Sequence, residues 1–120
     1  MKAILFIFIG GGLGSVARYV LSKFNFINAI PYGTLIANIL GCFLTGLILA
    51  YINKNNGFSK ELFLLLATGF CGGFTTFSTF AYENQNFLKS GDYSSFILYT
   101  ALSFILGLLA VTAGLALIKN

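Results

Sequence analysis

One segment of this chain places helix-breaking residues inside a stretch that should cross a membrane as an unbroken helix. Residues 62–82 carry no charged side chain, yet their middle reads GFCGGFTTFSTF at 69–80. In hydrocarbon an unpaired backbone N–H or C=O is costly, so a break is tolerated only where the freed groups face protein, an ion or a polar cavity. Transporters and channels hold ions at broken helices of this kind. The segment therefore predicts a third helix that is broken at mid-membrane, with an ion site at the break.

The overall composition independently indicates an integral membrane protein. Of the 120 residues, 58% are apolar and 8% are charged, whereas roughly 25% are charged in a soluble domain. Apolar runs of nearly the roughly 20 residues that span a bilayer core lie at Ala3–Leu21, Thr34–Ile52, Leu62–Tyr82 and Phe96–Ile118. We expect one all-α, four-helix transmembrane domain over residues 1–120, in contact with lipid in the cell (plasma or inner) membrane. Its expected spans are about 3–24, 33–52, 62–82 and 96–118.

The positive charges are distributed too evenly to fix one orientation in the membrane. The side that holds both termini and the middle loop would carry Lys2, Lys54, Lys60 and Lys119. The other side would carry Lys23, Lys89 and, if it snorkels, Arg18. Because orientation follows Lys/Arg bias, this weak bias predicts insertion in both directions and an antiparallel, dual-topology homodimer; one fixed orientation is the alternative. The net charge of +4 indicates interfacial anchoring and no nucleic-acid surface.

Polar side chains within the spans are few, which makes each one a candidate for a pathway. Asn38 either bonds to a neighbouring helix or lines a path. Arg18 either snorkels or bonds to carbonyls, or it forms an electropositive vestibule that concentrates anions. The carboxylates Glu61, Glu83 and Asp92 lie at span ends or in loops. No carboxylate is therefore expected at mid-membrane to carry a proton or to hold a cationic drug.

Aromatic and hydroxyl side chains alternate in the third span. Phe77 and Phe80 are three residues apart and share a helix face. Hydroxyls accompany them in the third and fourth spans, at Ser78, Thr79, Tyr99 and Ser103. Such a stripe is commonly packing, but ring edges are positive, and hydroxyl donors can replace part of the water shell of a small, hard anion. Carbonyls released at residues 72–75 could also hold one bare structural cation.

Three motifs together resemble the fluoride channels of the Fluc, or CrcB, family. They are GFCGGFTTFSTF at 69–80, GGGLGSVARY at 10–19 and GTLIANILG at 33–41, and the resemblance covers essentially the whole chain. It implies a fluoride-selective channel of microbial membranes, not an enzyme, that exports F− passively and reduces fluoride toxicity. It also implies an antiparallel dual-topology homodimer with two pores and a central sodium ion.

The resemblance further implies roles for particular residues. Phe77 and Phe80 resemble the pore-lining phenylalanine pair, and Asn38 resembles the pore asparagine. The backbone carbonyls of Gly72 and Thr75 match positions that hold sodium. The expected polar track beside the rings comprises Ser78 and Thr79, with Tyr99 and Ser103 as further members. Arg18 and Glu83 occupy family-like places, with vestibule or structural roles.

Two other classes of membrane protein are weighed against this interpretation. A small dual-topology multidrug or guanidinium-type exporter would share the size and the topology, but that mechanism needs an intramembrane glutamate, and the first span has none. A small membrane enzyme such as a lipid kinase would need acidic metal ligands at the interface. The three carboxylates of this chain lie in different regions of the sequence.

Overall fold

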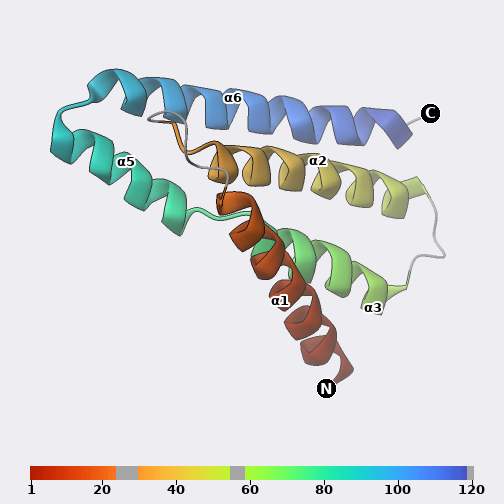
Figure 1. Ribbon diagram of the computed structural model, residues 1–120. Helices are drawn as coiled ribbons and strands as arrows, with labels where there is room; N and C mark the ends of the chain where they lie inside the picture. The colour runs from red at the N-terminus through yellow and green to blue at the C-terminus, as the bar shows by residue number, and fades with distance from the viewer. Residues whose placement is uncertain (24–29, 55–58, 119–120) are drawn as a thin grey trace.

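The computed structural model describes residues 1–23, 30–54 and 59–118, and its described elements are helices (Figure 1). They are α1 (Lys2–Ser22), α2 (Tyr32–Lys54), α3 (Lys60–Phe63), the π-helix η1 (Leu64–Cys71), α4 (Gly72–Phe74), α5 (Ser78–Ser90) and α6 (Tyr93–Ile118). Four segments of the described chain are long and apolar enough to cross a membrane: Lys2–Ser22, Tyr32–Lys54, Lys60–Ser90 and Tyr93–Ile118. The expected all-helical architecture with four membrane-length segments is thus confirmed. Phe24, where the first span was expected to end, and Lys119 lie outside the described residues.

The third segment differs most from its expected bounds, because helix α5 continues past Tyr82 to Ser90. Hydropathy ends the run before the polar residues 83–86, but helical hydrogen bonding does not require apolar side chains. The helix stops at Gly91, whose φ of 79° is in the left-handed region that favours glycine. The N–H of Asp92 then donates to the carbonyl of Phe87 at 2.8 Å. This tight turn leads directly into α6.

The helices pack in two groups that meet at the third segment. Helix α2 lies along α6, and α5 also packs on α6, while α1 crosses η1 and α4 (Figure 1). Gly10 and Gly14 let α1 approach η1 and α4 closely, because a Cβ at either position would meet the backbone of η1 or of α4. This GxxxG pair is therefore explained by helix packing.

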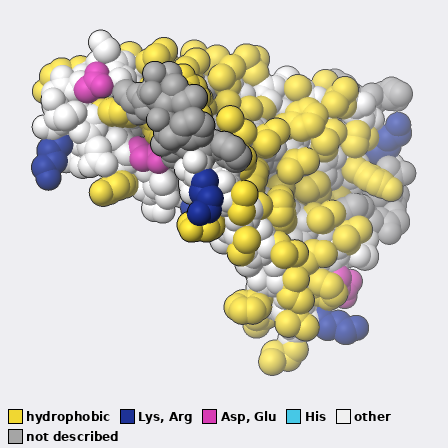
Figure 2. Space-filling view, viewed as in Figure 1, with side chains coloured by type: hydrophobic (Ala, Val, Ile, Leu, Met, Phe, Trp, Pro, Cys, Tyr) yellow, Lys and Arg dark blue, Asp and Glu magenta, His cyan; other side chains and the backbone are white. Residues whose placement is uncertain are grey.

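The molecule is thin, and most of its apolar surface is exposed. Its principal extents are 51 × 34 × 19 Å, so the shortest is about two helix diameters. A small buried cluster joins Ile30, Leu35, Phe80 and Tyr99. Apolar side chains spread over much of the face seen in Figure 2, with charged side chains in only a few places. Such a surface suits a protein whose outside contacts lipid or another apolar surface.

Candidate functional site

Regular helical structure stops between α4 and α5. Thr75 is extended, with φ −86° and ψ 157°, and α5 begins only at Ser78. The N–H and the hydroxyl of Thr75 both donate to the carbonyl of Cys71, at 3.0 Å and 2.8 Å. Residues 75–77 therefore leave the helix within the third apolar segment, and their backbone groups need other partners.

Asn38 of α2 supplies two of those partners. Its Nδ2 donates to the carbonyl of Thr76 at 3.1 Å, and the N–H of Thr76 donates to its Oδ1 at 2.7 Å. The hydroxyl oxygen of Thr76 in turn accepts from the N–H of Thr79 at 3.2 Å, which supports the start of α5. Asn38 thus bonds to a neighbouring segment, and it also lines the cavity described below.

Arg18 joins α1 to the same interruption. Its Nε donates to the carbonyl of Gly73 at 3.2 Å, and the side chain is half-buried. Gly73 lies so close to α1 that a Cβ on it would meet the carbonyl of Gly11. Of the alternatives for Arg18, the carbonyl bond is the one that the structure describes. A vestibule role for Arg18 stays a prediction.

An open cavity of about 560 Å³ lies beside the interruption. It is bounded by α2, the residues from α4 to α5, and α6, and its lining residues are Asn38, Cys42, Thr45, Gly72, Thr75, Thr76, Phe77, Phe80, Ser103, Phe104, Gly107, Leu108 and Val111. Six residues that the sequence singled out meet here: Asn38, Gly72, Thr75, Phe77, Phe80 and Ser103. The lining does not include Ser78, Thr79, Tyr99, Arg18 or Glu83, and their assignment to a pathway stays a prediction.

Two phenylalanine rings stand at the wall of this cavity. The ring centroids of Phe77 and Phe80 are 6.1 Å apart with an angle of 44° between the planes. Phe77 is 74% exposed, whereas Phe80 is 8% exposed. The ring of Phe104 meets that of Phe80 nearly edge-on, at 6.2 Å and 84°. Sequence reasoning missed Phe104 because it lies outside the motifs, and only its place beside Ser103 could have indicated it.

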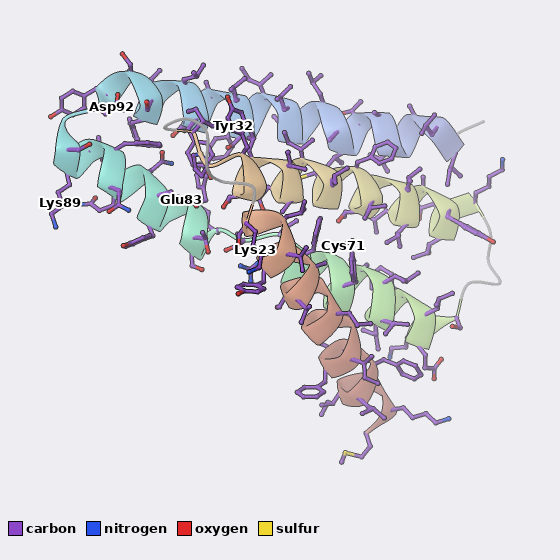
Figure 3. All side chains as sticks on the ribbon, in the orientation of Figure 1. Lys23, Tyr32, Cys71, Glu83, Lys89 and Asp92 are labelled. Carbon is purple, nitrogen blue, oxygen red and sulfur yellow. The ribbon has the colours of Figure 1, made fainter. Side chains whose placement is uncertain are left out.

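Tyr99 does not line the cavity but packs against Phe80, which does. It is fully buried, and its ring packs against Phe80 with centroids 5.1 Å apart. Its hydroxyl donates to Oε1 of Glu83 at 2.6 Å, and the hydroxyl of Thr34 donates to Oε2 at 2.9 Å. Glu83 therefore ties the middle of α5 to α2 and α6 (Figure 3). Thr34 lies within the motif at 33–41, but its bond to Glu83 was not expected from that motif.

Backbone oxygens at the interruption are of the kind that a hard cation prefers. Among the described residues, no donor bonds to the carbonyl of Gly72 or of Thr75. Gly72 is exposed and Thr75 is partly exposed. The described residues contain no group of three or more His, Cys, Asp or Glu side chains that could hold a metal ion. Backbone carbonyl oxygens suit a hard cation rather than a metal that prefers imidazole or thiolate ligands.

Comparison with known proteins places the chain in a family. Residues 5–115 match the CrcB-like protein family, Camphor Resistance (CrcB). Among its relatives is the "Fluoride-specific ion channel FluC" of Gloeothece citriformis, 48% identical, with 100% of this chain and 99% of that protein covered. Proteins of the same name from Flavobacterium psychrophilum and Leptospira interrogans are each 46% identical, with coverage of 100% and 99% for this chain and 99% and 96% for the relative. With four membrane-length helices and a family match over nearly its whole length, this multi-pass membrane protein belongs to the CrcB family.

Proposed function

We propose that this chain forms a fluoride-selective ion channel, through which F− leaves the cytoplasm passively so that its toxicity is reduced. The observation that carries the proposal is the cavity at the helix interruption, which Asn38, Phe77, Phe80 and Ser103 line together. The full-length relatives carry the name fluoride-specific ion channel, which supports the same assignment. Channels are not enzymes, and the reaction consists only of moving the ion across the membrane.

The cavity offers the interactions that a dehydrated anion needs. Nδ2 of Asn38 carries two hydrogens, and the bond to Thr76 uses one of them. The rings of Phe77, Phe80 and Phe104 differ in plane, so positive ring edges can turn toward an anion. None of the described residues that line the cavity is charged. No carboxylate therefore repels an anion there, and no fixed cation would hold it too tightly to leave.

The same cavity argues against the multidrug or guanidinium-type exporter. A cationic substrate needs an intramembrane carboxylate, but helix α1 contains no acidic residue, and Glu83 is committed to Tyr99 and Thr34. The described cavity lining provides no substitute. The fluoride channel is accordingly the better account of this chain.

The proposal includes an antiparallel, dual-topology homodimer with the helix interruption at mid-membrane. One subunit is only 19 Å thick in its shortest extent, and its cavity is open. Phe77 is 74% exposed, and the carbonyls of Gly72 and Thr75 lack donors among the described residues. Polar backbone groups cannot face lipid. A second copy related by a two-fold axis would cover these groups with the same surface of its own.

A structural sodium ion is part of this assembly. The carbonyl oxygens of Gly72 and Thr75, from both subunits, would hold it, since hard oxygen ligands suit a sodium ion. When bound, the ion supplies a positive charge that compensates carbonyl dipoles released by the interruption. Thr75 positions its own oxygen, because its N–H and hydroxyl are held at the carbonyl of Cys71 while its ψ of 157° turns its carbonyl out of the helix direction.

The experiment that tests this function is fluoride efflux from liposomes containing the purified protein, followed with a fluoride electrode. We expect rapid efflux once a potassium ionophore removes the electrical barrier, without ATP and without a proton gradient. Empty liposomes are the control. Absence of efflux, or efflux that requires ATP or a proton gradient, contradicts the channel. Proton-driven guanidinium export would support the alternative instead.

A further inference from the structure

Several hydroxyls of this protein bond to a carbonyl in the preceding helical turn. The side chains of Thr45, Thr75 and Thr112 each donate, at 2.8 Å, to the carbonyl four residues earlier. This back-bonding is the ordinary way in which a threonine satisfies its hydroxyl inside a helix. A buried hydroxyl that does not use it therefore remains available to donate to something else.

Thr100 and Ser103 of α6 are two such hydroxyls. Both oxygens are buried, and neither has a hydrogen-bond partner within the described part of the chain. Leaving a buried polar group unpaired is costly, and in native proteins such a group needs a specific explanation. Thr112, farther along the same helix, shows that α6 can accept the ordinary bond.

The two hydroxyls belong to the helix face that lines the cavity. The lining residues of α6 are Ser103, Phe104, Gly107, Leu108 and Val111. Thr100 is three residues before Ser103, four before Phe104 and seven before Gly107, and these spacings place it on the same face one turn earlier. Thr100 thus continues the cavity-lining face of α6 toward the end that holds Tyr99.

The neighbouring side chains define what could reach this pair. The hydroxyl of Tyr99 is committed to Glu83 at 2.6 Å, so it is not free to solvate an ion. The side chain of a helical residue leans over the preceding turn, which directs Phe104 toward the turn of Thr100. Phe104 is itself largely exposed. Ser103 lines the cavity directly, and a shift of the Phe104 ring would extend the cavity to the hydroxyl of Thr100.

We propose that the hydroxyls of Thr100 and Ser103 together form a binding position for fluoride, at the end of the cavity where its lining on α6 begins. The inference rests on the proposed channel function, and it adds Thr100 as a residue that binds the ion directly. Two O–H donors on one helix face suit a small, hard anion, because fluoride accepts short hydrogen bonds and has lost part of its water shell. Thr100 would then set how readily fluoride passes between Phe104 and the Glu83 end of the pathway.

The test compares Thr100→Val, Thr100→Ser and the matched control Thr112→Val in the liposome efflux assay, over a range of fluoride concentrations. Valine keeps the volume of threonine but removes the donor, whereas serine keeps the donor and loses a methyl group. We expect Thr100→Val to lower the efflux rate by about tenfold or more, as for loss of a hydrogen bond to a charged group. Thr100→Ser and Thr112→Val should remain near the parent.

The outcomes separate this inference from the channel function. If the parent conducts fluoride and Thr100→Val conducts equally well, the binding position is wrong and the channel stands; if the parent itself is silent, the channel function fails. If Thr100→Val is active and Thr100→Ser is inactive, the methyl group of Thr100 matters for packing and its hydroxyl does not matter for transport. That result would also overturn the inference. Should Thr100→Val not purify as the parent does, Thr100→Ala against Thr100→Ser makes the same comparison. The double variant Thr100→Val with Ser103→Ala should lower the efflux rate by less than the two single variants combined, because both hydroxyls bind one ion.

Discussion

The side-chain amide of Asn38 takes over both backbone hydrogen bonds of Thr76, donating to its carbonyl at 3.1 Å and accepting from its N–H at 2.7 Å. A backbone segment that leaves the helix within an apolar span needs such replacements. One residue of α2 therefore does two things. It stabilises the interruption, and it stands in the wall of the cavity.

Removing this amide should affect stability and transport together. Asn38→Ala leaves the N–H and the carbonyl of Thr76 without their partners, and we expect a loss of about 1–3 kcal/mol in the free energy of unfolding. Fluoride efflux should also fall sharply, because a donor is lost from the cavity. Thermal unfolding in detergent and the efflux assay measure the two effects. Asn53→Ala, at an exposed position near the end of the same helix, is the control; a fully stable Asn38→Ala would mean that these bonds contribute nothing.

Two glycines of α1 should respond oppositely to the same substitution. In Gly14→Ala the new Cβ would meet the carbonyl of Phe70 and the N–H of Phe74, which are backbone atoms and cannot turn aside. We expect destabilisation by about 1–3 kcal/mol from this overpacking. Gly12→Ala has open space around its Cβ, so it should be neutral or slightly stabilising. Equal thermal stability of the two variants would show that α1 does not pack on η1 and α4 in this way.

Dual topology can be measured in intact cells. Asn53 is exposed in the last turn of α2, beside the middle connection, so Asn53→Cys introduces one thiol when Cys42 and Cys71 are replaced by alanine. An impermeant reagent should label about half of the molecules, because weak Lys/Arg bias leaves both orientations accessible. Reaction after cell lysis gives the total. Labelling of all molecules, or of none, would show one fixed orientation.

We expect sodium to be required for dimer assembly, and we expect a sodium gradient not to drive fluoride transport. Complete replacement of sodium by a much larger cation should reduce the dimer fraction or the fluoride efflux, because an oxygen cage depends on ion size. Size-exclusion chromatography and the efflux assay report these effects. A sodium gradient imposed across the liposomes should not concentrate fluoride. Accumulation of fluoride driven by sodium would instead identify a symporter.

The sequence predicts the helices and much of the cavity for definite physical reasons. Long apolar runs show the membrane-length segments, and glycines and hydroxyls within an uncharged run indicate an interruption in 69–80. The expected release of carbonyls at 72–75 lies too early in the chain: Gly72–Phe74 stays helical, and the irregular residues are 75–77. Asn38 stands out because polar residues in spans are few. These signals are local, so they can be recognised without knowing how the helices pack.

What the sequence could not supply depends on packing between helices. Tyr99 is four residues from Ser103, which suggests one shared face, yet its hydroxyl reaches Glu83, while Ser103 lines the cavity. The bond from Thr34 to Glu83 joins residues far apart in the chain. Helix α5 extends past the apolar run to Ser90, with Glu83 bonded to α2 and α6. Neither hydropathy nor motif spacing contains these contacts.

In the proposed channel, fluoride passes along the cavity walled by Phe77 and Phe80. Phe77→Ile and Phe80→Ile keep apolar bulk but remove the ring edge that can face an anion. If the rings only pack, each change should cost about 1–3 kcal/mol of stability and leave transport intact. Phe6→Ile, which alters a phenylalanine outside the cavity lining, is the matched control.

The most direct measurement is therefore fluoride efflux from liposomes that contain the parent, Phe77→Ile, Phe80→Ile or Phe6→Ile at equal amounts of protein. We expect efflux to collapse in both cavity variants, although each still purifies as a single species of the size of the parent, and we expect Phe6→Ile to conduct like the parent. Parental fluoride efflux through both Phe77→Ile and Phe80→Ile would contradict this expectation, and would place the permeation path elsewhere.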